Sequence, residues 1–418
     1  MNATNGNRRI VITGLGAVTP LGADVAATWQ GLVEGCSGVA LITDYDTSEL
    51  GTKIAARVRG FNAGRYMDPK EARRLSLFIQ FGIAAAAQAV EHAGIDFAGE
   101  DPTRVGVEIG SSLGGTDLVE EQRSILDKRG PRAVNPTAIP AILISSAACA
   151  VAIRYGARGP VSVPVNACAT GVTAVGEAYR RILHGDADIM IAGGTDSVMS
   201  ALGITAFGRL GALSTKNDRP ERACAPFSAD RDGTVLGEGA AALVLETLEH
   251  AQARGASILA EVAGYGLTSD AFHMAAPDPE GAGAARAMAR ALASDGEAAE
   301  NLSRICAHGT GTPLNDLSET KAVKRLFGGA AYRTPISSIK GALGHMLGAA
   351  GAVSVLAGVK AIETGIIPPT INYAVPDPEC DLDYVPNVAR RAEVNVFMAN
   401  AFGFGGQNAV VVVKRFVV

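Results

Sequence analysis

The chain has 418 residues, of which 48% are hydrophobic and only 19% charged, with 50 glycines and a net charge of −5. This composition is typical of a large α/β protein with a well-buried core, and it excludes a disordered or fibrous chain. The negative net charge argues against a nucleic-acid partner, because such a partner selects a strongly basic face.

The cysteines and the N-terminal segment indicate a compartment. Six cysteines show no CxxC pairing, so we expect reduced intracellular thiols and no metal site. Residues 1–9 are polar and lack the apolar core of a signal peptide. No uninterrupted apolar run reaches the roughly 18 residues that a membrane span needs. The sequence therefore predicts a cytosolic protein that does not enter a membrane.

Strand-like apolar runs alternate along the chain with alanine-rich helical stretches. Residues 9–13 are predicted as a strand, 75–93 as a helix, 105–109 as a strand and 161–166 as a buried strand. A helical pattern at 169–183 follows the last of these. This alternation predicts βα units in which helices cover layered sheets.

A glycine pair after the first strand superficially resembles a dinucleotide-binding loop. Gly14 and Gly16 have the right spacing, but Thr19 stands where the third glycine of that fingerprint belongs. No helix is predicted to start at the required place either. We therefore expect no nucleotide cofactor.

The two halves of the chain show a weak internal similarity in their order of predicted elements. An alanine-rich helix precedes the glycine-rich strand segment 104–115, and another, at 283–293, precedes the segment 304–312. A strand-to-helix turn follows each, at Cys168 in the first half and at 336–345 in the second. We predict a duplication with halves 1–256 and 257–418 that meet at one site, and no short-period repeat is present.

Cys168 lies at the turn between a predicted strand and a predicted helix. The free N–H groups and the positive dipole end of a helix stabilise a thiolate, so we expect a lowered pKa for this thiol. The thiolate is the nucleophilic form of cysteine. The alternative interpretation is a small buried hydrophobic residue, which is the commoner role of an isolated cysteine.

Two of the six histidines occupy comparable positions. His308 ends a predicted strand and begins a glycine-threonine loop, and His345 is flanked by glycine at a predicted helix start. The other four have ordinary surroundings at helix ends, in a polar helix, or as a structural hydrogen bonder under the site: His92, His184, His250 and His273. Two such histidines opposite a nucleophile-type turn predict a catalytic cluster.

Five motifs, in order and spanning nearly the whole chain, make the sequence similar to one enzyme family. They are VITGLGAVTPLG at 11–22, NACATG at 166–171, HGTGTP at 308–313, KGALGH at 340–345 and NAFGFGG at 400–406. On these motifs the chain resembles β-ketoacyl-acyl-carrier-protein synthases of the thiolase superfamily, most closely the ketoacyl synthase II type.

The resemblance implies a fold and a reaction. The fold would be thiolase-like, with two related halves forming a layered αβαβα sandwich. The protein would be an acyltransferase of fatty-acid or polyketide biosynthesis. Cys168 would take an acyl group from an acyl carrier protein, malonyl-carrier protein would lose carbon dioxide, and its carbanion would attack the acyl thioester. The implied partners are the carrier protein and a second subunit, in a homodimer or a heterodimer with a ketosynthase-like chain. The implied enzyme has no cofactor other than the carrier's phosphopantetheine.

The same resemblance assigns catalytic roles. His308 and His345 would donate hydrogen bonds to the malonyl thioester oxygen as charge develops on it. Backbone N–H groups of Cys168 and Phe404 would form a second oxyanion hole, with Phe404 also gating the pocket. Lys340 and Glu319 match a supporting ion pair that orients His308, and a purely structural salt bridge is an equal alternative.

Substrate contacts are also implied. Thr310 and Thr312 match residues that contact the pantetheine arm, although loop-capping hydroxyls are the commoner role for such threonines. Leu113, Phe402 and Ala138 match substrate-binding positions, Leu113 being a chain-length-sensing one. Thr137 and Ala138 replace two aromatic residues of a segment that reaches toward the acyl pocket across the dimer interface. We therefore predict a roomier pocket that accepts branched, long or functionalised chains.

A basic cluster at Lys70, Arg73 and Arg74 is a candidate docking surface for the acidic carrier protein. The alternative is an ordinary solvated helix face.

Two rival functions fit the sequence less well. A thiolase would carry a second catalytic cysteine near the closing motif, and residues 403–406 contain none. A non-catalytic partner subunit of a polyketide system would lack the nucleophile, whereas Cys168 is present. The second rival, or a heterodimer with such a subunit, remains the alternative. Gln407 replaces the usual small residue or histidine after the gate glycines, and the sequence assigns it no role.

Overall fold

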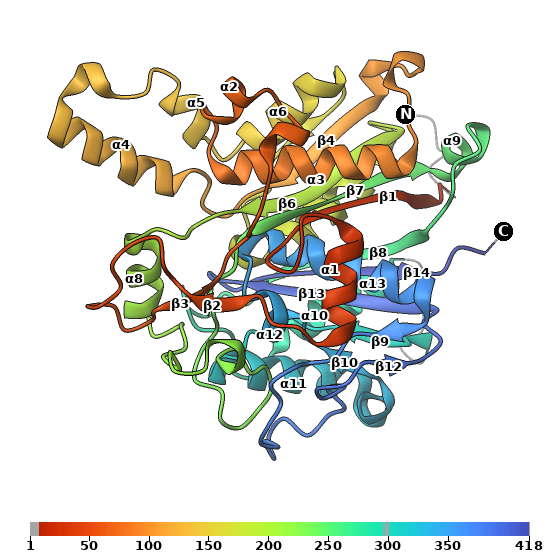
Figure 1. The fold of residues 1–418 in the computed structure, drawn as a ribbon. Helices are drawn as coiled ribbons and strands as arrows, with labels where there is room; N and C mark the ends of the chain where they lie inside the picture. Colours follow the sequence, from red (N-terminus) through yellow and green to blue (C-terminus); the bar gives the residue numbers. More distant parts are fainter. Residues whose placement is uncertain (1–7, 295, 297–300, 418) are drawn as a thin grey trace.

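A ten-stranded mixed sheet organises the computed structural model, which describes residues 8–294, 296 and 301–417 (Figure 1). In spatial order the strands are β10 (Ile336–Ser337), β9 (Arg304–Cys306), β13 (Val396–Gly403), β14 (Gln407–Lys414), β8 (Ala260–Ser269), β1 (Ile10–Val18), β7 (Gly239–Thr247), β6 (Ile189–Asp196), β4 (Val105–Gly110) and β5 (Val161–Ser162).

The sheet consists of two five-stranded halves with the same topology. From the centre outward, one half runs β1-β7-β6-β4-β5 and the other β8-β14-β13-β9-β10. In each half the first two pairings are antiparallel and the last two are parallel. A short antiparallel pairing of β1 with β8 joins the halves. Identical order and direction in both halves confirm the predicted relation between them.

Helices form three layers around these strands. α7 (Thr170–His184) and α13 (Ala350–Thr364) contact each other and strands of both halves, so they form the central layer. α3 (Leu77–Ala93) covers β1 and β7 on one outer face, and α10 (Ala282–Ala293) covers β8 and β14 on the other. This is the αβαβα arrangement of the predicted thiolase-like fold (Figure 1).

Shorter elements complete the fold. The remaining helices are α1 (Val25–Glu34), α2 (Pro69–Ala72), α4 (Thr116–Arg129), α5 (Ala138–Ile142), α6 (Ser146–Tyr155), α8 (Ala201–Arg209), α9 (Leu248–Ala253), α11 (Pro313–Phe327) and α12 (Lys340–Leu343). Two small two-stranded antiparallel sheets pair β2 (Val39–Leu41) with β3 (Ile54–Ala56) and β11 (Ile366–Ile367) with β12 (Arg390–Arg391).

The glycine pair of the first strand is a packing feature. A Cβ atom on Gly16 would lie 2.7 Å from the backbone nitrogen of Ala89 in α3, and one on Gly14 would lie 2.9 Å from the Cβ of Ala93. Glycine therefore lets α3 approach β1 closely, which explains the spacing without any nucleotide.

The two central helices begin with the same backbone turn. The 3₁₀ turn η5 (Ala167–Ala169) precedes α7, and η9 (Leu347–Ala349) precedes α13. Each turn opens on a non-glycine residue with positive φ, 47° at Ala167 and 48° at Leu347. The counterpart of Cys168 in the second half is therefore Gly348, whereas the sequence had suggested the turn at His345.

One predicted strand is much shorter than expected. Only Val161 and Ser162 of the run 161–166 are in a strand, and Val161 is exposed. The prediction of a buried strand is wrong, because β5 is a two-residue strand at the edge of the sheet and Val161 and Val165 are exposed.

Within the described part of the chain, one helical stretch is apolar enough to cross a membrane by length and composition. It spans Leu347–Thr364 and has a mean hydropathy of 1.3, and 83% of it is buried inside the protein. This stretch contains the central helix α13, so burial between the two halves of the sheet accounts for its apolar composition.

Candidate active site

Cys168 lies in η5 at the start of α7, where the sequence placed it. Its side chain is buried, and it lines a pocket of about 480 Å³. Burial raises the pKa of the thiol to about 11, while Lys340 and the backbone N–H groups of Phe404 and Cys168 act in the opposite direction. The predicted lowering of this pKa is therefore wrong for the free enzyme, because the cost of desolvating a thiolate exceeds the gain from nearby dipoles.

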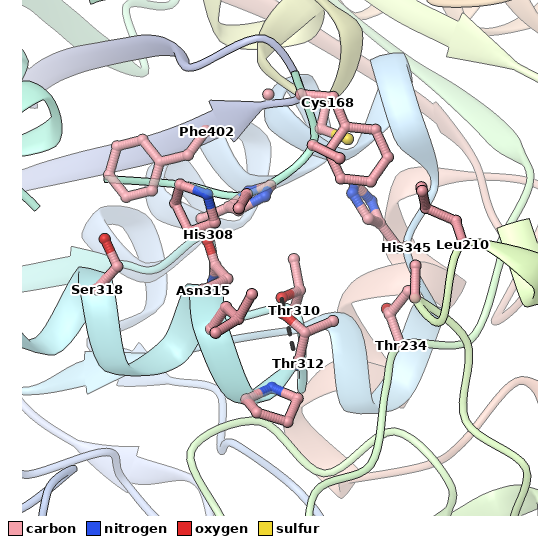
Figure 2. Close-up of a pocket in the computed structure, with 18 of the residues that line it drawn as sticks. Cys168, Leu210, Thr234, His308, Thr310, Thr312, Asn315, Ser318, His345 and Phe402 are labelled. Atoms are coloured by element: carbon pink, nitrogen blue, oxygen red, sulfur yellow. Dashed lines mark hydrogen bonds between the residues drawn. The ribbon is translucent and has the colours of Figure 1, made fainter. Parts of the chain in front are cut away.

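Both predicted histidines line the same pocket as Cys168. The rings of His308 and His345 are 5.4 Å apart and nearly perpendicular, and Figure 2 shows them below Cys168 from two different elements. Burial, followed by the charge of Lys340, lowers the pKa of each well below its ordinary value. Both imidazoles are therefore neutral at physiological pH.

Hydrogen bonds fix which nitrogen of His345 carries the proton. Its Nδ1 accepts from the backbone N–H of Leu347 at 3.2 Å. The proton of the neutral ring must then be on Nε2, which is buried and has no protein partner. His345 thus presents a free N–H donor to the pocket.

His308 is fixed in the same tautomer. The Lys340 ammonium donates to the backbone oxygen of His308 and lies 3.4 Å from Nδ1 of its ring. A cationic donor beside Nδ1 requires that nitrogen to be the acceptor, so Nε2 carries the proton. The site therefore holds a nucleophile-type thiol and two neutral N–H donors in one cavity.

Sequence comparison identifies the family to which this arrangement belongs. The β-ketoacyl synthase N-terminal domain matches residues 7–251, and the β-ketoacyl synthase C-terminal domain matches residues 259–374. The chain belongs to the β-ketoacyl synthase family. A 3-oxoacyl-[acyl-carrier-protein] synthase 2 from Coxiella burnetii is 47% identical over 408 residues, covering 98% of this chain and 99% of that protein. One from Staphylococcus aureus (strain N315) is 45% identical over 410 residues, covering 98% and 99%.

Solved ketosynthases have the same fold. One structure, of a type II PKS acyl-carrier protein in complex with its ketosynthase bound to the hexaketide, gives a TM-score of 0.90 at 34% identity and covers 99% of this chain and 100% of that chain. The ishigamide ketosynthase/chain length factor gives 0.91 at 36% identity, covering 99% and 100%. These matches confirm the thiolase-like ketosynthase architecture.

Lys340 and Glu319 flank the His308 turn of this ketosynthase without pairing directly. Glu319 accepts from the backbone N–H groups of His308 at 2.9 Å and Gly309 at 2.7 Å. Lys340 binds the same turn through the His308 carbonyl, and among the described residues the two charges form no ion pair within 4 Å. The predicted salt bridge is replaced by two separate charged contacts with one backbone turn, each buried.

Residues of the closing motif surround the nucleophile and the first histidine. The backbone N–H of Phe404 donates a hydrogen bond to the Cys168 sulfur, and Phe404 also lines the pocket. The Phe402 ring lies 5.7 Å from the His308 ring. Gln407, to which the sequence gave no role, donates from Nε2 to the Phe404 carbonyl at 3.3 Å.

The two threonines predicted to bind pantetheine also line the pocket. Their hydroxyls, of Thr310 and Thr312, are 2.7 Å apart (Figure 2). Thr310 is buried, so its hydroxyl faces the cavity and not bulk solvent. Both positions suit a polar ligand entering toward Cys168.

Two predicted substrate-binding residues lie elsewhere in the single chain. Leu113 is 37% exposed and Ala138 is buried in α5, and neither lines the pocket that contains Cys168. For Ala138 the sequence interpretation requires a second subunit, because its segment was expected to reach the pocket of a partner. One chain by itself therefore leaves these two assignments as predictions.

The predicted docking residues are exposed and do not line the pocket that contains Cys168. Lys70 is in α2, and Arg73 and Arg74 follow it. Arg73 and Arg74 border a separate, smaller cavity together with Asp117 and Glu121. Their exposure suits docking, and their function stays a prediction.

Several pocket residues carried no sequence signal. Leu210 and Phe207 of the α8 region, Thr234, and Asn315 of α11 line the cavity. They stand in segments without a recognisable motif, and long-range packing alone brings them to Cys168. His273 also lines the pocket, and its Nδ1 accepts from the backbone N–H groups of residues 275 and 276, as a structural hydrogen bonder does.

Proposed function

We propose that this ketosynthase condenses an acyl group held on Cys168 with malonyl-acyl-carrier protein, releasing carbon dioxide and forming β-ketoacyl-carrier protein. The observation that carries the proposal is the presence of one thiol and two neutral imidazole N–H donors in a single pocket. Every step is written with these groups and two thioester substrates, so we propose no cofactor besides the carrier's phosphopantetheine.

Acyl transfer comes first. The Cys168 sulfur attacks the acyl thioester, the new carbon–sulfur bond forms, and the bond to pantetheine breaks. The proton lost by Cys168 ends on the released pantetheine thiol. Burial raises the pKa of Cys168 and favours the neutral thiol, so we propose that its proton leaves as the sulfur attacks. Backbone N–H groups of Cys168 and Phe404 bind the oxyanion of the tetrahedral intermediate.

Decarboxylation follows in the same pocket. The bond between the malonyl α-carbon and its carboxylate breaks, carbon dioxide leaves, and the electron pair passes into the thioester as an enolate. The Nε2–H groups of His308 and His345 donate to the enolate oxygen. Neutral donors in a buried site stabilise charge as it develops and need no reorganisation.

Condensation completes the cycle. The enolate carbon attacks the acyl carbonyl on Cys168, a carbon–carbon bond forms, and the bond to the Cys168 sulfur breaks. The sulfur leaves as a thiolate and takes up a proton from solvent water, which replaces the one that left with the pantetheine thiol. The product remains on the carrier protein as a β-ketoacyl thioester.

Intact mass spectrometry tests the proposal directly. The chain is incubated with a panel of acyl-carrier proteins, and Cys168→Ala is the control. We expect a mass gain on the unaltered chain only, and release of the label as β-ketoacyl-carrier protein after malonyl-carrier protein is added. No adduct with any donor would refute the proposal and favour the non-catalytic partner subunit.

We further propose that the enzyme is a dimer formed through the β5 edge of the sheet. α5, α6 and β5 together expose large apolar side chains, with Ile139 69%, Leu143 51% and Ile153 81% exposed. Contiguous exposed apolar surface beside a free strand edge is typical of an interface. The partner is a second copy or a ketosynthase-like subunit, as in the ketosynthase/chain length factor structure, and it would bring the Thr137–Ala138 segment to the other subunit's pocket.

The carrier-protein partner follows from the same proposal. Lys70, Arg73 and Arg74 would attract its acidic surface, a contact that acts mainly on association. Charge reversal at all three positions should raise the KM for acyl-carrier protein and leave kcat unchanged. An unchanged KM would exclude this surface as the docking site. The cytosolic location expected from the sequence also remains a prediction.

A further inference from the structure

Asp196 is a wholly buried carboxylate at the end of β6 that the reaction, as written above, does not use. Among the described residues no lysine or arginine forms an ion pair with it. All its partners are neutral N–H and O–H groups from two other segments. Burial raises the pKa of this carboxyl, whereas the hydrogen bonds donated to it act in the opposite direction. Both of its oxygens only accept hydrogen bonds, as in the carboxylate form. Burying that charge costs free energy, so its retention needs a reason.

The two oxygens of Asp196 tie together the ends of three segments. Oδ1 accepts from the Ser111 hydroxyl at 2.6 Å and from the backbone N–H of Leu113 at 3.3 Å. Oδ2 accepts from the Ser112 hydroxyl at 2.7 Å and from the backbone N–H of Gly348 at 2.6 Å. The loop after β4 and the turn η9 are thereby fixed to the end of β6.

The contact with Gly348 reaches the second catalytic histidine through one residue. Gly348 follows Leu347, whose N–H holds Nδ1 of His345 and so leaves Nε2–H free for substrate. Leu347 has a φ of 48°, a conformation that a β-carbon disfavours and that surrounding contacts must maintain. The carboxylate of Asp196 supplies such a contact at the adjacent peptide group.

We propose that Asp196 is a positioning residue that anchors η9 and thereby keeps the Nε2–H of His345 directed at the substrate. The inference rests on the proposed function, in which His345 stabilises the enolate. It assigns Asp196 a role in the decarboxylation step and none in direct contact with substrate.

The related halves of the fold sharpen this inference. Gly348 is the counterpart of Cys168. The Asp196 carboxylate, which binds the N–H of Gly348, therefore lies at the start of α13, as the Cys168 thiol lies at the start of α7. Anions are stabilised at such helix starts. Burial is the main reason that the pKa of Cys168 is raised, and the nearby charge of Asp196 raises it further. Removing the charge should therefore make Cys168 more reactive while His345 becomes less well placed.

The opposite signs of these two effects give the test. The Asp196→Asn variant is assayed at a temperature where circular dichroism shows a folded chain. We expect its kcat for decarboxylation of malonyl-carrier protein to fall about tenfold or more, because the transition state loses part of its stabilisation. The KM should stay unchanged. The rate of Cys168 alkylation by iodoacetamide at pH 8, read by peptide mass spectrometry, should rise severalfold.

Glu246→Gln is the matched control. Glu246 is equally buried on the neighbouring strand β7, but it pairs with Ile189 at the other end of β6, roughly 23 Å from Asp196 at the usual rise per residue. This variant should lose stability and keep both rates. If Asp196→Asn behaves like it, or loses alkylation and decarboxylation together, Asp196 is structural only and the proposal is overturned.

A second variant covers the case in which Asp196→Asn does not fold. A Cβ on Gly348 would lie 2.5 Å from Asp196 Oδ2, so Gly348→Ala breaks the same contact and keeps the charge. We expect slower decarboxylation and unchanged alkylation, and an unchanged decarboxylation rate would overturn the proposal. Alkylation needs no substrate, so it can be measured whatever the enzyme's activity. If the unaltered chain does not decarboxylate malonyl-carrier protein, the proposed function is refuted independently of the role of Asp196.

Discussion

At the scale of single residues, burial decides the acid–base behaviour of the site. It disfavours the thiolate of Cys168 and the imidazolium forms of His308 and His345 at the same time. In the free site these three side chains are therefore uncharged, as a protonated thiol and two neutral rings. Such a site reserves its hydrogen-bond donors for the oxyanion and the enolate that form during reaction.

This protonation state predicts the pH dependence of Cys168 modification. Because burial raises the pKa of its thiol to about 11, the thiolate fraction should grow about tenfold per pH unit between pH 7 and 10. We expect the iodoacetamide rate at Cys168 to rise accordingly, measured by peptide mass spectrometry. Exposed Cys36 and Cys149 serve as internal references. A plateau below pH 8 would contradict this protonation state.

Removal of one enolate donor should separate the two half-reactions. In His345→Ala we expect condensation to slow by about 100- to 1000-fold, the usual loss for one oxyanion donor. The acyl-enzyme should still form, because Cys168 and the N–H of Phe404 remain. Mass spectrometry and product formation measure the two steps separately. His184→Ala, at the far end of α7, is the control, and equal loss of both steps in His345→Ala would contradict this assignment.

At the scale of elements, close contact of α7 with α13 sets the geometry of both catalytic turns. A Cβ on Gly171 would lie 2.5 Å from the backbone nitrogen of Ala352, and one on Gly351 would lie 2.6 Å from that of Val172. Two glycines in facing helices thus allow backbone-to-backbone packing. The turns η5 and η9, which begin these helices, are brought together as a result.

Gly171→Ala should therefore disturb stability and activity together. Overpacking of this kind typically costs about 1–3 kcal/mol, so we expect a lower Tm by differential scanning calorimetry and slower acylation of Cys168. Gly208→Ala in α8 is the matched control, since a Cβ there meets nothing within 4 Å. That change should leave Tm the same or slightly higher. A Gly171→Ala chain with native Tm would show that the helices can separate freely.

The charged cluster that joins β7 to α9 predicts how stability depends on pH. Hydrogen bonds and charge from Arg254, His250 and Thr13 outweigh burial and lower the pKa of Glu246 to about 2, and Glu246 in turn raises that of His250. The Glu246 contribution is present above pH 4.5 and is lost as pH falls toward 2. The His250 contribution is full below pH 6.5 and is lost as pH rises through its raised pKa.

Stability from this cluster should thus be greatest between about pH 4.5 and 6.5, the interval between the two reference values. Thermal melts from pH 3 to 9 on the unaltered chain and on Glu246→Gln measure the difference. The gap in Tm between them should be widest inside this interval and narrow on both sides. A gap independent of pH would contradict the cluster's titration.

At the scale of the whole molecule, the proposed dimer would complete the predicted acyl pocket. A charge at Ile153, which is 81% exposed on α6, should oppose burial of this face in an interface. We expect Ile153→Asp to be monomeric by sedimentation velocity, with unchanged circular dichroism and strongly reduced acylation. Ile153→Val should remain dimeric. A dimeric Ile153→Asp chain would mean that the interface lies elsewhere.

The sequence by itself determined the family and the α/β class, and it predicted the duplication and the catalytic roles of Cys168, His308 and His345, which the structure brings into one pocket. These follow from local signals: motifs that keep Cys168, His308 and His345 beside glycine-rich turns, and periodic apolar runs that predict strands and helices. Local chemistry is sufficient there, because each motif carries its own backbone turn. The glycine pair of β1 has a tertiary explanation that its spacing alone does not give, because it lets α3 pack closely against the strand.

Only the tertiary structure decided the properties that depend on burial and on distant neighbours. The raised pKa of Cys168 comes from the protein around it, and the separate contacts of Lys340 and Glu319 come from the path of one backbone turn. The exposed edge position of β5 and the role of Asp196 have the same origin. Desolvation and the path of the backbone in space leave no local pattern in a single sequence, so folding alone reveals these properties.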